Sequence, residues 1–400
     1  MHNFKFRLYP NYCITSLIDS EKESVKLMTN DSKNNTRSKS IKNEGDLMKQ
    51  TKCVWQFHNK SDALKEVFDY FRFCTNEIIR VSEQKNLTSR GAMHKEFYKN
   101  LRGDFIAKYI QSATSVAKAK LKLYRTTKKK KPNAKIPYVK RNMITLDNQS
   151  FKIQDDILRI PIKPYEYIFI KLHSYVIKQL EDTKVGSITL TPEKLIISYS
   201  KEIFQISPEH HIGIDRNFDN ATSFDTTGKF MVYNLEKTNQ IKATCKAVKS
   251  KFKRNEARIR KKLYSKYGKK EKNRVHQLLH EVSKKIVSQN QGIILEDLKG
   301  IRKLYRKGNG QGKKTRGKMN SWSFYELQRQ IEYKALWAGL PVQYVKANYT
   351  SSKCSECGTK LVPEENRMMT CNSCKIIVDR DINASRNILN RGMRFVPHAV

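Results

Sequence analysis

Four cysteines within one short stretch constrain the fold of this chain more than any other feature. They form two C-x-x-C pairs, Cys354 with Cys357 and Cys371 with Cys374, and thirteen residues separate the pairs. Each pair presents two thiolates on one tight turn, so the two turns supply the four soft ligands of a tetrahedral zinc ion. Because thiolates would fill every position, such a site is structural and not catalytic. Four free or disulfide-bonded cysteines are the alternative.

The charge balance indicates a polyanionic partner. The chain has 79 Lys and Arg against 38 Asp and Glu among its 400 residues, a formal net charge of +41. A polyanion relieves self-repulsion of this size, which makes nucleic acid the expected partner. A basic ribosomal or chromatin-like protein without catalytic chemistry would show the same excess of cations.

The other cysteines favour a reducing compartment. Cys13, Cys53, Cys74 and Cys245 are scattered, unlike the cysteines of a disulfide framework. The sequence has no apolar run of about 18 residues that would predict a membrane span, and its N-terminus has no apolar signal core. We therefore expect a cytoplasmic, nucleoid-associated protein with no membrane partner.

The first half of the sequence changes pattern several times. Residues 1–50 are rich in Ser, Asn, Lys and Asp and are expected to be mostly flexible, although residues 1–10 could form a short strand. Residues 61–126 carry apolar side chains at helical spacing, and one expected helix runs from about 93 to 123. The run TTKKKKP at 126–132 is interpreted as a basic linker.

Short strands flank these helices on both sides. Alternating apolar residues predict strands within 51–60 and 127–207, with turn residues between them. This pattern is typical of an antiparallel barrel or sandwich. The helices would then be an insertion into it.

The second half contains two buried strands that each end in a carboxylate. The strand that begins at His211 ends in Asp215, and the strand that begins at Gly292 ends in Glu296. A third acid, Asp381, stands at the start of a helix directly after the second cysteine pair. Acids on adjacent rigid elements could hold two divalent metal ions about 3.5–4 Å apart for phosphodiester hydrolysis. Magnesium prefers such oxygen ligands to thiolates.

Helical patterns fill much of the chain between these acids. Residues 236–290 predict a long helical pair rich in Lys and Arg. Residues 308–317 are interpreted as a flexible basic loop, whose spacing does not fit a Walker A motif. An aromatic-rich amphipathic helix is expected over 320–338, and a last strand over 341–345.

Four motifs together carry a family resemblance. They are GIDRN at 213–217, ILEDL at 294–298, the two cysteine pairs, and DRDINASRNIL at 379–389. This set resembles the TnpB family, the RNA-guided nucleases that insertion sequences encode and that are related to type V CRISPR effectors. The resemblance is strong over about 205–392, weaker over 51–205, and absent from 1–50.

The resemblance implies an α+β multidomain fold. A RuvC nuclease domain of RNase H-like fold would occupy 208–348, interrupted by a zinc ribbon at 349–378, with its final helix at 379–392 and a tail at 393–400. The strands within 51–60 and 127–207 would form a β-barrel wedge domain. The helices of 61–126 would form a recognition module.

The resemblance also implies roles for the acids. The catalytic, magnesium-binding residues would be Asp215, Glu296 and Asp381, with Asp379 as the alternative for the third. The residues Arg216 and Asn217 depart from the family, in which many members have one residue and then Gly after the first Asp.

The function implied by the resemblance is an RNA-guided DNA endonuclease of a transposable element. A guide RNA would pair with one strand of a double-stranded DNA target, while the protein reads a short adjacent motif. The cofactors would be a structural Zn²⁺, two Mg²⁺ ions and the guide RNA. A nuclease-inactive RNA-guided DNA-binding protein and a DNA strand-transfer transposase are the alternatives.

Overall fold

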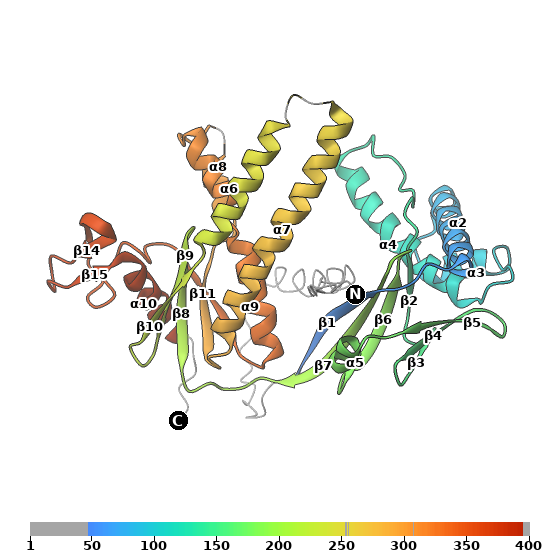
Figure 1. Ribbon diagram of the computed structural model, residues 1–400, viewed down its shortest axis with the longest axis horizontal. Coiled ribbons are helices and arrows are strands. Elements are labelled where there is room, and N and C mark those ends of the chain that lie inside the picture. The colour runs from blue at the N-terminus through green and yellow to red at the C-terminus, as the bar shows by residue number, and fades with distance from the viewer. Residues whose placement is uncertain (1–46, 253, 255, 307, 395–400) are drawn as a thin grey trace, which may run out of the picture. The chain divides into compact units, whose positions relative to one another are not determined.

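The structure is a computed structural model that describes residues 47–252, 254, 256–306 and 308–394 (Figure 1). The chain divides into two compact units, one over Lys49–Glu202 and one that begins at Ile203. The strand considered for residues 1–10 and most of the expected flexible segment lie outside the described residues. Among the described residues, no helix combines the length and apolar character needed to cross a membrane.

Three helices form the helical part of the first unit: α2 (Asp62–Gln84), α3 (Arg90–Tyr98) and α4 (Lys108–Lys130). Helix α2 packs against α4, and its Val67, Phe68 and Phe71 are buried. The single helix expected over 93–123 is wrong, because the chain leaves the helix after Tyr98 and starts a new one at Lys108. Gly103 lies in this break, where a residue of low helix propensity favours interruption.

The basic run TTKKKKP is helical and not a linker. Helix α4 continues through this run to Lys130. Lysine is a good helix former, so charge alone does not end a helix. Pro132 explains why the helix stops there, since proline disfavours helical geometry at the residue before it.

Two sheets complete the first unit. One has the order β1-β7-β6-β2, formed by Leu47–Phe57, Lys194–Phe204, Lys184–Leu190 and Ile144–Leu146. The other has the order β3-β4-β5, formed by Lys152–Gln154, Ile157–Lys163 and Glu166–Lys171, and helix α5 (Ser174–Leu180) follows it. Residues 47–50 belong to strand β1, which corrects their assignment to the flexible segment. A barrel closed from these sheets stays a prediction.

The second unit is built on a five-stranded mixed sheet of order β10-β9-β8-β11-β12. Its strands are β8 (His211–Arg216), β9 (Asn220–Asp225), β10 (Phe230–Asn234), β11 (Gly292–Asp297) and β12 (Val342–Lys346). The first three form an antiparallel meander, whereas β11 runs parallel to both β8 and β12. The parallel strands need crossovers, and helices supply them.

Helices cover both faces of this sheet (Figure 1). The expected basic pair is present as α6 (Glu236–Lys251) and α7 (Ala257–Val287), between β10 and β11. Side chains of α7 and α9 (Phe324–Trp337) share one core with Ile212, Ile214 and Leu295 of the sheet. Helix α10 (Arg380–Met393) packs on the other face, against Phe224 and Ile294.

One glycine sets how closely α10 approaches the sheet. A Cβ atom at Gly213 of β8 would lie 2.3 Å from the backbone oxygen of Ser385 and 2.5 Å from the backbone nitrogen of Leu389. Both atoms are backbone and cannot move aside as a flexible side chain would. Glycine is therefore required where α10 rests on β8.

The segment between β11 and β12 differs from expectation. Residues Ile301–Tyr305 form a short 3-10 helix, and α8 (Lys313–Ser321) begins inside the expected loop at 308–317. The helix expected over 320–338 starts only at Phe324, because Trp322 is extended and breaks the helix. Three short strands follow β12, namely β13 (Val362–Pro363), β14 (Met368–Thr370) and β15 (Ile377–Asp379).

Candidate active site and metal-binding cluster

Three acids meet at one edge of the five-stranded sheet. Asp215 and Glu296 are each the second-to-last residue of their strands, β8 and β11. These strands are parallel neighbours in which Ile214 pairs with Leu295, so the two acids emerge side by side. Asp381 lies in the first turn of α10, which packs across β8. The structure therefore brings together three acids that are distant in sequence.

Burial makes this cluster electrostatically costly. Asp215, Glu296 and Asp381 are only 5%, 6% and 5% exposed. Burial is the largest cause that raises the pKa of Asp215, and the nearby charges of Glu296 and Asp381 add to it. Together they raise this pKa to about 7. Burial also raises the pKa of Glu296, opposed by the hydrogen bond from Thr350. Bound divalent cations would relieve both the repulsion and the desolvation, so the donor set fits magnesium.

Each carboxylate has a donor that orients it. Asn217 Nδ2 donates to Asp215 Oδ2 over 2.7 Å, and Asn220 Nδ2 donates to Asp381 Oδ2 over 3.3 Å. The hydroxyl of Thr350 donates to Glu296 Oε1. Hydrogen bonds of this kind fix the direction of an acid before any ligand arrives.

The two candidates for the third acid are used differently. Oδ1 of Asp379 accepts hydrogen bonds from the backbone nitrogens of Asp381 (2.8 Å) and Ile382 (3.2 Å). Asp379 is therefore the N-cap of α10. Asp381 instead contributes its charge to the cluster, where it raises the pKa of Asp215. It is also ion-paired with Arg367.

Arg216 is a site residue that the sequence analysis marked only as a departure from the family. Its side chain is fully buried, with 2% exposed. Nη1 donates to Gln328 Oε1 of α9 over 2.7 Å, and Nη2 donates to the backbone oxygen of Glu296. Arg216 therefore ties the ends of β8 and β11 to α9. The sequence signal for this role is its position, because an arginine directly after the acid of a buried strand needs buried hydrogen-bond acceptors.

Asn217 is a second residue whose role follows from the fold and not from the sequence. While its side chain holds Asp215, its backbone oxygen accepts a hydrogen bond from Trp322 Nε1 over 2.7 Å. Lys242 of α6 in turn donates to the backbone oxygen of Ser321 and to Ser323 Oγ, on either side of Trp322. The segment between α8 and α9 is thus bonded both to α6 and to the strand end that carries Asp215.

The four predicted cysteine ligands also converge. Their sulfur atoms all lie within 4.8 Å of one another. Sγ of Cys354 is 3.6 Å from that of Cys374, and Sγ of Cys357 is 3.4 Å from that of Cys371. A tetrahedral zinc ion with bonds of about 2.3 Å would hold sulfurs roughly 3.8 Å apart. Disulfide sulfurs lie about 2.05 Å apart, so the disulfide alternative does not fit.

The cysteine cluster supports the helix that carries Asp381. Asn383 of α10 is fully buried, and its amide donates to the backbone oxygen of Lys353 over 2.8 Å. Its carbonyl oxygen accepts from the backbone nitrogen of Ser355 over 2.9 Å. These two contacts flank Cys354, so the position of this candidate metal ligand is coupled to the position of α10, which carries Asp381.

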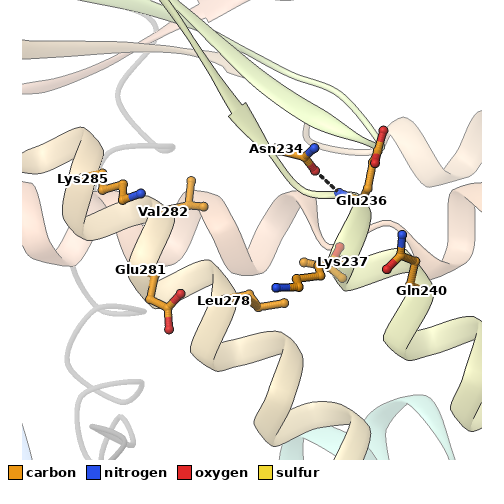
Figure 2. A pocket seen from close by; sticks show the side chains of 9 residues that line it. Asn234, Glu236, Lys237, Gln240, Leu278, Glu281, Val282 and Lys285 are labelled. Carbon is orange, nitrogen blue, oxygen red and sulfur yellow. Dashed lines mark hydrogen bonds between the residues drawn. The ribbon is translucent and has the colours of Figure 1, made fainter.

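A separate groove of about 440 Å³ lies between the start of α6 and the C-terminal third of α7 (Figure 2). Lys237, Glu281 and Lys285 line it, together with apolar atoms of Leu278 and Val282. Asn234 Oδ1 accepts from the backbone nitrogen of Glu236 at its rim over 2.8 Å. None of the three clustered acids lines this groove, so it is distinct from the candidate active site.

Comparisons with known proteins agree with these features. A family model described as "Cas12f1-like, TNB domain" matches residues 324–388. The TnpB-like protein MJ0751 of Methanocaldococcus jannaschii is 33% identical over 265 residues, which cover 60% of this chain and 92% of that protein. The putative RNA-guided DNA endonuclease InsQ of Escherichia coli is 31% identical over 128 residues, which cover 28% of this chain and 31% of InsQ.

Solved structures share the fold. A Cas12f1–sgRNA–target DNA complex, determined by cryo-EM, matches 82% of this chain and 81% of that chain with a TM-score of 0.56 and 16% identity. The mini-RNA-guided endonuclease CRISPR-Cas_phi3 matches 95% of this chain and 97% of that chain with a TM-score of 0.52 and 11% identity. At such low identity, the likeness concerns the fold alone.

Proposed function

The chain belongs to the TnpB-like family, and from this premise we propose that it is an RNA-guided DNA endonuclease of a transposable element. The observation that carries the proposal is the convergence of Asp215, Glu296 and Asp381 from two parallel strands and one helix. Three buried carboxylates at one sheet edge are a costly arrangement that cations would stabilise.

The sheet topology supports a RuvC domain of RNase H-like fold. An antiparallel meander of three strands is extended by two parallel strands, and α10 crosses the meander on the face opposite α7 and α9. This arrangement has Asp215 and Glu296 at the carboxyl ends of adjacent parallel strands, with Asp381 on α10 beside them. Ligands of open α/β sheets commonly bind there.

The residues of the candidate site would have two roles in hydrolysis, namely binding the metal ions and orienting the residues that bind them. Asp215, Glu296 and Asp381 would hold two Mg²⁺ ions, while Asn217, Thr350 and Asn220 orient these carboxylates. When bound, such a pair of ions supplies an activated water and stabilises the leaving oxygen of a phosphodiester. Arg216 keeps the two strand ends in place behind the acids.

The four cysteines would hold a structural Zn²⁺ ion. All four ligands are thiolates, so no coordination position is left for a substrate. Its function would be mechanical, because Asn383 bonds the backbone on both sides of Cys354 to α10. We assign this cluster a role in holding Asp381, not in the chemistry.

Guide RNA and double-stranded DNA are the proposed partners. The formal net charge of +41 requires a polyanion, and the basic pair α6 and α7 belongs to the acid-bearing unit. A related fold was solved with sgRNA and target DNA. Base pairing between guide and target would carry the sequence specificity, while the protein contacts the backbone and a short adjacent motif.

The test begins with the full chain expressed together with its flanking DNA. We expect one discrete RNA to co-purify, and a plasmid that carries its complement to be cut in the presence of Mg²⁺. Asp215→Ala should lower cleavage roughly 1,000-fold or more, because stabilisation by the metal ions is worth several kcal/mol. RNA binding should be unchanged.

A matched control is Asp297→Asn, which neutralises an exposed acid next to Glu296. Its Oδ1 accepts a hydrogen bond from the backbone nitrogen of Lys299, and its charge is a minor influence on Arg216, so we expect near wild-type cleavage. Retained Mg²⁺-dependent cleavage by the Asp215→Ala variant would overturn the site assignment. DNA binding without cutting would indicate the nuclease-inactive alternative, and products joined to new DNA would indicate a transposase.

A further inference from the structure

The small sheet of β3, β4 and β5 has one buried and one open face. Leu158, Ile160 and Ile162 of β4 are buried, and they alternate with more accessible residues. Pro161 accepts a hydrogen bond from Tyr109 of α4 through its backbone oxygen, so α4 lies beside this strand. Because side chains alternate along a strand, the intervening residues project from the opposite face.

The strand register shows what gathers on the open face. Lys152 pairs with Arg159, and Arg159 pairs with Phe169 on the next strand. Pro161 pairs with Tyr167 beside them. Directly opposed residues of antiparallel strands share one face, so these side chains form adjoining rows.

Two aromatic rings dominate this open face. Phe169 is 63% exposed and Tyr167 is 41% exposed. Their ring centroids are 6.3 Å apart, and the Arg159 guanidinium carbon lies 4.7 Å from the centroid of the Tyr167 ring. Two large rings and a planar cation left accessible side by side are unusual for a surface without a partner.

The charge of this face is positive. By the strand register, the outward positions of the three strands carry the cations Lys152, Arg159, Lys163 and Lys171 and one carboxylate, Glu166, which pairs with Lys163 beyond a bulge in β4. Asp156, in the turn between β3 and β4, lies 3.4 Å from Lys171 and partly balances it. Lys152 and Arg159 flank the aromatic row. The face therefore combines flat apolar rings with groups that attract phosphate.

We propose that this face, formed by Lys152, Arg159, Tyr167 and Phe169, is a stacking platform for unpaired bases of RNA. Aromatic and guanidinium planes bind bases that are splayed out of a helix, and nearby cations hold the backbone. Loops and bulges of a folded RNA present such bases, whereas duplex DNA keeps its bases stacked. That this RNA is the guide rests on the proposed function.

The first measurement is fluorescence anisotropy with the full chain. The probes are a labelled 12-nucleotide oligo(U) RNA and an abasic RNA of the same length, at about 0.3 M salt to weaken phosphate contacts. The wild-type chain should prefer oligo(U) by at least about fivefold, and Tyr167→Ala/Phe169→Ala should remove that preference. Affinity for the abasic RNA should stay the same in both proteins.

Two control variants separate stacking from folding. Tyr167→Phe/Phe169→Tyr keeps both rings and should retain the preference for oligo(U). Phe73→Ala removes a ring that is 57% exposed on α2 of the same unit, and it should leave binding unchanged. Thermal unfolding of each variant checks that the unit is intact.

The second measurement uses the RNA that co-purifies with the full chain, made with 4-thiouridine. Ultraviolet cross-linking followed by peptide mapping should identify residues 165–171 in the wild-type chain. The Tyr167→Ala/Phe169→Ala variant should lose that cross-link and keep others elsewhere on the protein.

The outcomes are distinguishable. Equal preference for oligo(U) in the wild-type chain and the alanine variant overturns the platform and leaves the proposed nuclease intact. A chain that co-purifies with no discrete RNA overturns the proposed function instead. A preference for oligo(dT) over oligo(U), lost in the alanine variant, would assign the platform to displaced single-stranded DNA and overturn the RNA proposal.

Discussion

The acid cluster and the cysteine cluster lie in the same unit and are built on opposite principles. The acids lie near the ends of two buried six-residue strands and at the start of a helix, so we expect the fold around them to persist without a metal ion. The cysteines sit on short turns beside a core of little more than Leu361 and Met369. A core that small cannot maintain a fold alone, so it needs a ligand that crosslinks it.

The contrast teaches what each metal ion would do. In the cysteine cluster an ion would supply the stability that the small core lacks. In the acid cluster the fold supplies the stability and brings three acids together, and a bound ion would relieve their repulsion. Loss of metal should therefore harm the first site and leave the second folded but strained.

The largest expected effect comes from removing one thiolate. Cys371→Ser should abolish zinc binding, because structural zinc contributes about 10–16 kcal/mol in small domains. The turns around it should unfold, and cleavage should fall at least about 100-fold as Asp381 loses its support. Zinc content by mass spectrometry and a cleavage assay check this outcome. The control Cys245→Ser changes a buried cysteine of α6 outside the cluster and should retain zinc.

A second prediction concerns the close packing of α10 on β8, which holds the helix that carries Asp381 against the sheet. Gly213→Ala would force α10 away from β8 and should destabilise the unit by about 3 kcal/mol, at the upper end for overpacking. Denaturant unfolding measures the loss. The control Gly268→Ala, in α7 with open space around it, should gain about 0.5–1 kcal/mol. Equal stability of the Gly213→Ala variant would refute the close packing of α10.

The third prediction tests the strain in the acid cluster through pH. The pKa of Asp215 is raised from 3.8 to about 7 in the folded chain. A raised pKa means that the folded state binds the proton of Asp215 more tightly than the unfolded state does. The stabilisation that comes from this protonation is complete below about pH 4 and is lost as the pH rises through about 7. Without Mg²⁺, Asp215→Asn should therefore stabilise the chain on the order of 2 kcal/mol at pH 8.

The same pair of proteins provides its own control. At pH 4 the stability difference between wild type and Asp215→Asn should shrink to less than about 1 kcal/mol, since Asp215 is then protonated in the folded state and nearly half protonated in the unfolded state. Thermal unfolding in zinc-containing, Mg²⁺-free buffer measures this difference. A variant that is less stable at pH 8 would show that the acid cluster, like the cysteine cluster, is part of what holds the fold.

The smallest expected effect is at Asn217. Asn217→Ala removes the 2.7 Å hydrogen bond to Asp215 while leaving the backbone oxygen that Trp322 contacts. We expect Mg²⁺ to be bound about three- to tenfold more weakly, since a typical intramolecular hydrogen bond contributes about 0.5–1.5 kcal/mol. A titration of cleavage against Mg²⁺ concentration measures this shift. An unchanged half-saturation concentration would remove Asn217 from the site.

Residues with a strong local signature could be predicted from the sequence. Asp215 and Glu296 end apolar strands, and the cysteines have metal-ligand spacing, so each was identifiable without the fold. The expected strands and the basic helical pair of the second unit are also present. In each of these cases the local pattern and the tertiary structure favour the same conformation.

Other features depended on tertiary structure. Arg216 is buried only because Gln328 and the Glu296 backbone, distant in sequence, accept its hydrogen bonds. The choice between Asp379 and Asp381 required the geometry of the helix start, where one acid caps the helix and the other joins the cluster. The linker predicted at 126–132 is largely part of α4, and α8 begins inside the loop predicted at 308–317. Both predictions were wrong because lysine-rich segments form helices as readily as loops.

The order of the three acids along the chain has a consequence for protein synthesis. Asp381 follows Asp215 by 166 positions, so a ribosome needs roughly 8–33 s to reach it at about 5–20 residues per second. In the later part of that interval, once Glu296 has been made, the nascent chain contains the basic helices α6 and α7 but only two of the three carboxylates. Nucleic acid captured early in translation therefore meets an incomplete cluster, and the acid site is assembled only when the last described helix has been made.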